Sequence, residues 1–221
     1  MEVILHGLTK RFGRETIVQD LDHVITSGSR TVILGPNGSG KSTLLQLIVG
    51  AMAPTAGSID HRHNGDPIEQ DQVYRHVSIA SPYLGLYEDL ALAEVIGIHG
   101  AFKPFLPGIT VEKVASIAYL GHVRDRAVID LSSGMKQRLK LALAILSDTP
   151  MLLLDEPASN LDAAAIRWYR ELLQQHLHHR TLIVASNHQP LEHDMCDRTI
   201  EMGMIAGRSS SAAARDLGER T

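Results

Sequence analysis

Residues 35–43, "GPNGSGKST", decide the fold that this sequence predicts. They match the pattern G-x-x-x-x-G-K-[ST], a glycine-rich loop whose backbone N–H groups can surround a chain of phosphates. The pattern needs a strand before it and a helix after it, and here "TVIL" (31–34) precedes it and "KSTLLQLIVG" (41–50) follows. The alternative is a glycine-rich turn that fits by coincidence, and such a turn would not need these flanking segments. The stretch therefore predicts a phosphate-binding loop in an α/β fold.

The residues of this loop have distinct expected roles. Gly35, Gly38 and Gly40 allow the backbone to wrap phosphates, because glycine adopts conformations that other residues avoid. Lys41 is expected to reach the outer phosphates, and the Ser42 hydroxyl suits a magnesium ion. A GTPase would carry an Asn-Lys-x-Asp motif, which does not occur in the sequence, so ATP is favoured. The expected ATP contacts in the loop are Gly35, Pro36, Asn37, Gly38, Ser39, Gly40, Lys41, Ser42 and Thr43.

Short apolar runs recur along the chain, and they are apolar on both faces, as buried parallel strands must be. They are "TVIL" (31–34), "VSIA" (77–80), "MLLL" (151–154) and "TLIVA" (181–185). Helical patterns lie between them, which predicts a parallel sheet with crossover helices. The first thirty residues read as short antiparallel strands, and residues 84–146 as a helical insertion. The predicted fold is α/β, with a parallel core sheet, an N-terminal antiparallel β subdomain and a helical insertion.

Two neighbouring acids follow the third apolar run. Asp155 is expected at the end of a buried strand, where a carboxylate can hold the magnesium ion directly or through water. Glu156 must point elsewhere, and it can polarise the water that attacks the γ-phosphate. The alternative is a plain N-cap acid after a strand. An adjacent acid pair favours a hydrolase over a kinase.

Composition narrows the class of protein. The chain has 221 residues, of which 44% are hydrophobic and 21% charged, enough for one α/β domain with a subdomain. A net charge of -4 gives no electrostatic reason to expect nucleic acid as a partner. Cys196 is the single cysteine, which favours a reducing compartment, and no run reaches the roughly 18 apolar residues of a membrane span. We expect the domain to cover residues 1–208 and residues 209–221 to be a flexible polar tail.

Several motifs in order resemble the ATP-binding domain of ABC transporters, a P-loop NTPase. "GPNGSGKST" and "LLLDEP" resemble its Walker A and B motifs, and "LSSGMKQR" (131–138) resembles its signature loop. "SNLD" (159–162) resembles the D-loop. His188, after "TLIVA", corresponds to the switch histidine, although a lone histidine after a strand is more often structural. Phe12 in "KRFG" resembles the aromatic residue that stacks on adenine.

The resemblance implies a head-to-tail homodimer that forms with ATP. In this family the signature loop of one chain caps the nucleotide on the Walker A loop of the other. The helix after "LSSG" would add amide donors and partial positive charge at the γ-phosphate. The residues expected to contact ATP in trans are Ser132, Ser133 and Gly134. The catalytic residues implied are Glu156 and His188, with Ser42 and Asp155 holding magnesium.

The sequence departs from the family pattern in two places. The signature reads "LSSGM" where LSGGQ is usual, so Ser133 and Met135 replace a glycine and a glutamine. Relatives usually carry a magnesium-contacting glutamine after the second apolar run, but Ser81, Pro82 and Tyr83 stand there. Coupling between nucleotide and partner could use water or Tyr83, and both alternatives stay open.

The function implied is an ATP-hydrolysing subunit of a membrane transporter, with magnesium as cofactor. Its membrane-spanning permease would be a separate chain, whose coupling element the helical insertion would receive. The location expected is therefore cytoplasmic, peripheral on the inner face of the membrane. The alternative is a soluble ABC-type ATPase of an assembly or biogenesis complex. Substrate and direction of transport do not follow, because the permease forms the substrate path.

Overall fold

The apolar runs form the central sheet of the molecule. The computed structural model describes residues 1–203 and 213–216 of the chain. The strand order is β10-β9-β3-β8-β7-β6, and all neighbours pair in parallel except β10 with β9. The strands are β3 (Arg30–Leu34), β6 (Val77–Ala80), β7 (Met151–Asp155), β8 (Thr181–Ser186), β9 (Arg198–Glu201) and β10 (Ala213–Asp216). The predicted parallel core sheet is confirmed.

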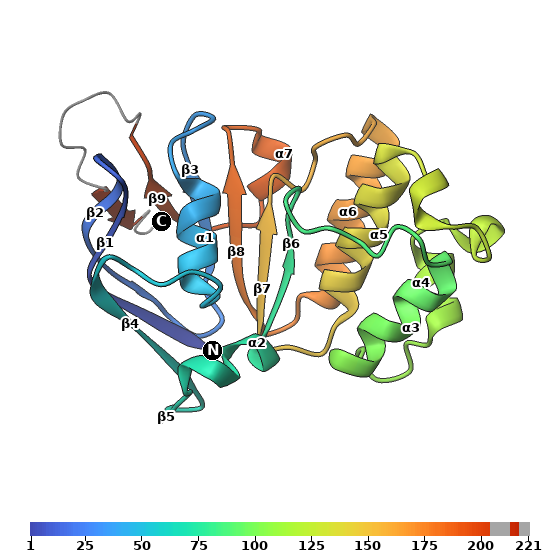
Figure 1. Cartoon of the computed structure of the whole chain (residues 1–221), viewed down its shortest axis with the longest axis horizontal. Helices are drawn as coiled ribbons and strands as arrows, with labels where there is room; N and C mark the ends of the chain where they lie inside the picture. Colours follow the sequence, from blue (N-terminus) through green and yellow to red (C-terminus); the bar gives the residue numbers. More distant parts are fainter. Residues whose placement is uncertain (204–212, 217–221) are drawn as a thin grey trace, which may run out of the picture.

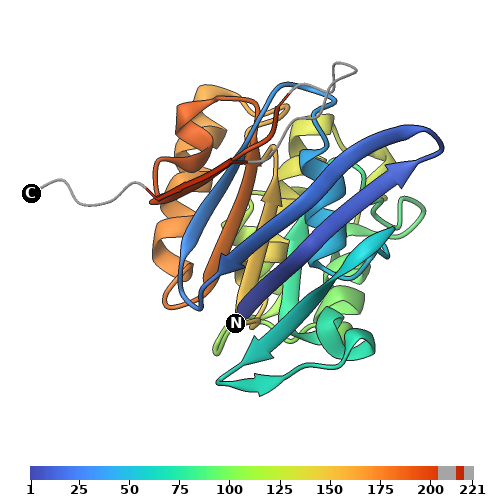
Figure 2. The same ribbon diagram turned by 90° about the vertical axis from the view of Figure 1, so that its left-hand side faces the viewer.

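A second sheet, antiparallel, covers one side of the molecule (Figures 1 and 2). Its order is β2-β1-β4-β5, with strands β1 (Glu2–Phe12), β2 (Glu15–Ile25), β4 (Ala56–His63) and β5 (Asp66–Pro67). The antiparallel start expected from the sequence is therefore confirmed. The sequence does not predict β4, because its residues "AGSIDHRH" are mostly polar and exposed, and backbone pairing with β1 holds it in the sheet.

Seven α-helices complete the described part of the chain. They are α1 (Lys41–Ile48), α2 (Val73–His76), α3 (Leu92–Phe102), α4 (Val111–Ile117), α5 (Ser133–Leu146), α6 (Ala163–His176) and α7 (Pro190–His193). No helix among residues 1–203 and 213–216 has the length and apolarity needed to cross a membrane. Helix α6 begins at Asp162, whose side chain accepts a hydrogen bond from the Ala165 amide, as its N-cap position predicts.

Two hydrophobic cores lie on the two faces of the parallel sheet. Strand β7 divides its buried side chains between them, because successive residues of a strand point to opposite faces. Leu152 and Leu154 pack with α3 to α6, whereas Met151 and Leu153 pack with α1 and the antiparallel sheet. Each face of the sheet is thus covered, and the loops at the carboxyl ends of the strands stay free to form a site.

The helical insertion extends from the far end of the sheet, where α3 and α4 pack with α5 (Figure 1). The sequence predicts these helices, and the structure confirms them. His99 of α3 bonds through Nε2 to the Ser147 hydroxyl at the end of α5, at 2.8 Å. Trp168 of α6 donates from its indole N–H to the carbonyl of Ile117 at 2.7 Å. These buried polar contacts hold the insertion against the core.

Of the expected polar tail, residues 209–221, the structure describes only residues 213–216. Residues 213–216 pair antiparallel with β9, because an edge strand offers unpaired backbone N–H and C=O groups. The other residues of the expected tail, 209–212 and 217–221, lie outside the described residues, as do residues 204–208 at the end of the expected domain.

Candidate functional site

The loop between β3 and α1, residues 35–43, is here named the phosphate loop. Gly40 precedes α1 with a φ of 95° and no side chain caps the helix, so the first amides of α1 remain available. A Cβ at Gly35 would lie 2.7 Å from the carbonyl oxygen of Met202, which leaves space only for glycine. The loop therefore combines a close backbone approach with an uncapped helix start, which attracts anions.

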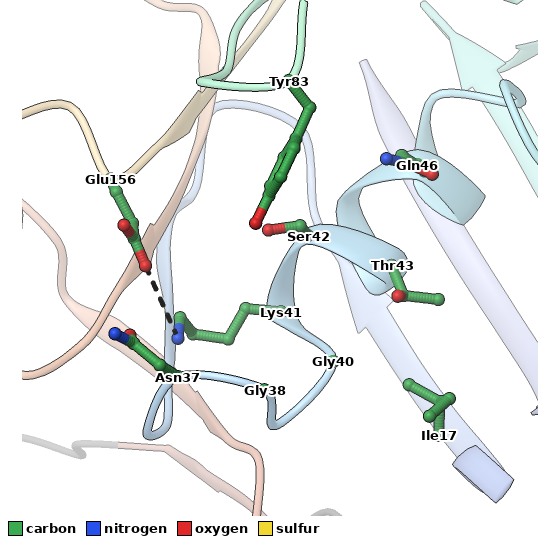
Figure 3. A pocket seen from close by; sticks show the side chains of 10 residues that line it. All are labelled: Ile17, Asn37, Gly38, Gly40, Lys41, Ser42, Thr43, Gln46, Tyr83 and Glu156. Atoms are coloured by element: carbon green, nitrogen blue, oxygen red, sulfur yellow. Dashed lines mark ion pairs between the residues drawn. The ribbon is translucent and has the colours of Figure 1, made fainter. Parts of the chain in front are cut away.

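A cavity of about 400 Å³ opens over this helix start. Figure 3 shows side chains from the phosphate loop, from β2, and from the loops after β6 and β7 lining it. The lining residues are Ile17, Asn37, Gly38, Gly40, Lys41, Ser42, Thr43, Gln46, Tyr83 and Glu156. Six predicted loop contacts and Glu156 thus meet at one cavity, while Ile17 and Gln46 carry no motif that would have identified them.

Lys41 is held in place by backbone groups of its own loop. Its side chain is 4% exposed, and Nζ donates to the carbonyls of Gly35 at 2.8 Å and Pro36 at 3.1 Å. The same Nζ lies 4.0 Å from Oε1 of Glu156. A cation fixed at the mouth of the loop in this way can meet an incoming phosphate without rearranging.

Asp155 ends β7, and its buried carboxylate has one oxygen that accepts no hydrogen bond from the described residues. Its Oδ2 accepts a hydrogen bond from the Ser81 hydroxyl at 3.0 Å, while Oδ1 is buried and has no partner among the described residues. Burial raises the pKa of Asp155, and the nearby hydroxyls of Ser42 and Ser81 lower it in part. A buried carboxylate with a free oxygen beside a serine hydroxyl fits a hard cation such as magnesium.

Glu156 turns away from Asp155 because its backbone is left-handed, with a φ of 47°. The amide of Glu156 donates to the carbonyl of Ala185 at 2.9 Å, and Ser159 Oγ lies 3.4 Å from Oε2. Asn160 and His188 also have positive φ, 61° and 71°. Non-glycine residues in this conformation cost free energy, and their gathering in the loops after β7 and β8 indicates a functional constraint.

His188 lies on the exposed loop after β8, outside the cavity lining. This loop meets the phosphate loop through the amide of Asn187, 3.5 Å from Oδ1 of Asn37. Phe12 ends β1, is 48% exposed and carries the Lys10 ammonium 5.1 Å from its ring centroid. Phe12 is not among the cavity-lining residues either, so its expected role stays a prediction.

The signature residues lie apart from the phosphate loop within one chain. Ser132 caps α5 by accepting a hydrogen bond from the Met135 amide at 3.2 Å, and both Ser132 and Ser133 are exposed. A Cβ at Gly134 would lie 3.1 Å from the carbonyl oxygen of Asn160, so the start of α5 packs closely on the loop after β7. None of the three signature residues lines the cavity.

Two residues near the position where relatives carry a glutamine, Ser81 and Tyr83, make separate contacts. Ser81 is 6% exposed and bonds to Asp155, whereas Tyr83 lines the cavity. Figure 3 shows the Tyr83 ring pointing from its loop toward the Ser42 hydroxyl. The sequence leaves water and Tyr83 open as alternatives, and the structure adds Ser81, whose partner lies 74 residues away and gives no local signal.

Comparisons with known proteins agree with this geometry. Residues 18–159 match the family model described as ABC transporter. The chain is 31% identical over 222 residues to the Nod factor export ATP-binding protein I of Rhizobium johnstonii, covering 97% of this chain and 71% of that protein. It is 30% identical over 198 residues to the cytochrome c biogenesis ATP-binding export protein CcmA of Rhizobium meliloti, covering 86% and 93%.

A third relative and a solved structure extend the comparison. The Fe(3+) ions import ATP-binding protein FbpC of Photobacterium profundum is 34% identical over 177 residues, covering 78% of this chain and 50% of that protein. A dimeric ATP-binding cassette in a post-hydrolysis state, bound to ADP and phosphate, superposes with a TM-score of 0.79. That structure is 21% identical and covers 99% of this chain and 100% of its own, which establishes the fold.

Proposed function

The chain belongs to the ABC transporter family of ATP-binding proteins, and we propose that it hydrolyses ATP with magnesium to energise a separate membrane-spanning partner. The observation that carries this proposal is the meeting of Lys41, Glu156 and the uncapped start of α1 at one cavity, beside the buried Asp155. Positive groups there can hold phosphates, and a carboxylate beside them can accept a proton from an attacking water.

The phosphate loop binds the nucleotide in this proposal. The free amides at the start of α1 and the ammonium of Lys41 bind the outer phosphates. Ser42 and Asp155 would hold magnesium, which when bound neutralises charge on the phosphate oxygens. Phe12 contacts the adenine from the end of β1.

Glu156 acts as the general base. It accepts a proton from the water whose oxygen bonds to the γ-phosphorus, while the bond from that phosphorus to the β–γ bridging oxygen breaks and ADP leaves. His188, on the loop after β8, keeps the γ-phosphate and the water aligned. The positive φ of both residues supports these roles, because strained backbone is retained where it has a function.

A second copy of the chain completes the site. Ser132, Ser133 and Gly134 cap the γ-phosphate of the partner copy, head to tail, since they lie outside the cavity of their own chain. Ser132 and Ser133 are exposed, and the start of α5 carries the partial positive charge of a helix N-terminus. ATP thus joins two copies, and hydrolysis releases them.

The identity of the membrane partner and of its substrate does not follow from this chain. Relatives of similar identity are named for Nod factor export and for Fe(3+) import, so this chain alone does not set substrate or direction. A second candidate is an ATPase of a biogenesis complex. The relative named for cytochrome c biogenesis favours it, because the alignment covers 93% of that compact protein.

The test of the proposed function is ATP turnover by the purified chain. We expect phosphate release with magnesium present and its loss when EDTA removes the metal, while ATP binding weakens less than turnover. Release that is unaffected by EDTA would contradict the roles of Ser42 and Asp155. Absence of both ATP binding and turnover would contradict the proposed function as a whole.

A further inference from the structure

A buried acid that the proposed reaction does not use lies beneath the catalytic loops. Glu192 of α7 is 3% exposed, although it follows the exposed loop that carries His188. Its Oε1 accepts a hydrogen bond from the Ala158 amide at 3.1 Å, and its Oε2 accepts a short hydrogen bond from the Ser186 hydroxyl. A buried carboxylate is costly unless such donors satisfy it, so this placement requires an explanation.

The two donors belong to the two loops that carry the proposed catalytic residues. Ala158 lies two residues after Glu156, in the loop after β7. Ser186 ends β8, two residues before His188, and its hydroxyl also accepts a hydrogen bond from the Gln189 amide at 3.2 Å. One carboxylate therefore connects both loops.

Helix α7 is itself anchored to the core. The hydroxyl of Tyr169, a fully buried residue of α6, donates to the carbonyl of Glu192 at 2.9 Å. The Glu192 amide donates to the carbonyl of Gln189 at 3.0 Å. The carboxylate is thus held at its backbone, so the two loops are fixed against a rigid support.

The electrostatics agree with this geometry. Burial raises the pKa of Glu192, while the Ser186 hydroxyl and the Ala158 amide lower it by favouring the ionised form. The charges of Glu156 and Lys41 also act on it, in opposite directions. The carboxylate is therefore close enough to the site to respond to its charges.

We propose that Glu192 is a positioning residue for ATP hydrolysis, which holds the loop of Glu156 and the loop of His188 in fixed relation. The inference rests on the proposed roles of those two residues. Glu192 itself touches neither nucleotide nor water. Its carboxylate acts through Ala158 and Ser186, so its loss misplaces the base and the histidine while the phosphate loop stays intact.

The first test is Glu192→Ala. It leaves the Ala158 amide and the Ser186 hydroxyl buried without their acceptor, so kcat should fall about 10- to 100-fold, as a displacement of about 1 Å can cause. The affinity for ATP, measured by calorimetry, should change less than about twofold, because the hydrogen bonds of the Glu192 carboxylate go to Ala158 and Ser186 and not to the phosphate loop. An unchanged kcat, or an affinity that falls as much as kcat, would overturn the proposal.

The matched control is Asp194→Asn. Asp194 lies just after α7 and pairs with Arg170 of α6, and none of its hydrogen bonds reaches either catalytic loop. Its variant should keep the parent kcat. A loss equal to that of Glu192→Ala would show that any disturbance of α7 has the same effect, and would overturn the specific role of the carboxylate.

A double variant separates positioning from general loosening. If Glu192 acts partly through His188, the loss of kcat in Glu192→Ala with His188→Ala should be smaller than the product of the two single losses. If the loss of kcat in the double variant equals the product of the two single losses, Glu192 does not act through His188, and the link is overturned.

Two milder variants cover the case in which Glu192→Ala does not fold. Glu192→Gln keeps one acceptor oxygen, so one of the two donors, the Ala158 amide or the Ser186 hydroxyl, loses its acceptor, and Ser186→Ala removes one of these donors. Both should fold and show a kcat below that of the parent, and parent kcat in both overturns the proposal. A parent chain that does not hydrolyse ATP would instead overturn the proposed function, so the two failures are distinguishable.

Discussion

Helices α1 and α5 begin in two different ways, although small residues precede both. The start of α1 has Gly40 in a left-handed conformation and no side-chain cap, so its first amides open into the cavity. The start of α5 is capped by Ser132, which accepts a hydrogen bond from the Met135 amide, and its residues do not line that cavity. The first amides of α1 are free to bind a ligand in the cavity of the same chain, whereas one of the first amides of α5 is already hydrogen-bonded to Ser132.

This difference supports the proposal that one chain contains two phosphate-directed helix starts. The α1 start has a cation, Lys41, and two carboxylates, Asp155 and Glu156, close to it. The α5 start offers hydroxyls, amides and a close backbone approach at Gly134, while Lys136 in its first turn is paired with Glu88. The first can bind and react, while the second can only add contacts to a phosphate held elsewhere.

Removing the base at the α1 start gives the largest expected effect. Glu156→Gln should lower kcat by about two to four orders of magnitude, because general-base catalysis is lost. ATP binding should persist, since Lys41 and the α1 amides remain, and the variant should accumulate as a dimer with ATP. Steady-state phosphate release and calorimetry measure the two quantities. Turnover at the parent rate would show that Glu156 is not the base.

Removing the cation at the α1 start should reduce binding itself. Lys41→Ala should weaken ATP binding about 10- to 100-fold, because hydrogen bonds to a charged donor contribute about 1.5–3 kcal/mol. Lys113→Ala is the control, since Lys113 is exposed on α4 and donates only to the carbonyl of Gly108 in its own loop. Equal affinities by calorimetry for parent and Lys41→Ala would place the nucleotide elsewhere.

A smaller effect, on stability, is expected at the other end of α5, where His99 bonds to Ser147. Burial, and then the charge of Lys103, lower the pKa of His99 from 6.5 to about 4, where its ring bonds to Ser147. Because the folded pKa lies below the unfolded value, His99 contributes stability above pH 6.5, and this stability is lost as pH falls toward 4. The loss is about 3 kcal/mol at most, at 1.36 kcal/mol per pKa unit.

His99→Gln provides the control for this pH dependence. Its amide can still donate to Ser147, but it does not titrate between pH 6.5 and 4. Denaturant unfolding at both pH values should show a smaller loss of stability in the variant than in the parent. Equal losses would mean that His99 is not the source.

Local patterns predicted the catalytic edge of the sheet well. The phosphate loop, the end of β7 at Asp155 and the start of α5 at Ser132 each depend on a few neighbouring residues, whose types and order set the backbone. The loop after β8 was also expected, because the apolar run ends at Ala185 and the polar residues that include His188 follow it.

Features that depend on distant neighbours could not be predicted in this way. Strand β4 is polar and is held by pairing with β1, and β10 pairs only because β9 leaves an open edge. The Ser81 hydroxyl meets Asp155 across 74 residues, and the Ala158 amide meets Glu192 across 34. In each case the sequence shows the polar residue, but only the fold supplies its partner.

The most direct test of the account is whether the α5 start serves a second copy of the chain. In a Glu156→Gln background, the molar mass with ATP and magnesium can be measured by light scattering for Ser132→Arg and for Ser116→Arg, the same change at an exposed serine of α4. A bulky cation at Ser132 blocks close approach to the partner's γ-phosphate, so we predict a monomer that still binds ATP, whereas Ser116→Arg forms a dimer. A dimer of Ser132→Arg at parent ATP concentrations would contradict the composite site.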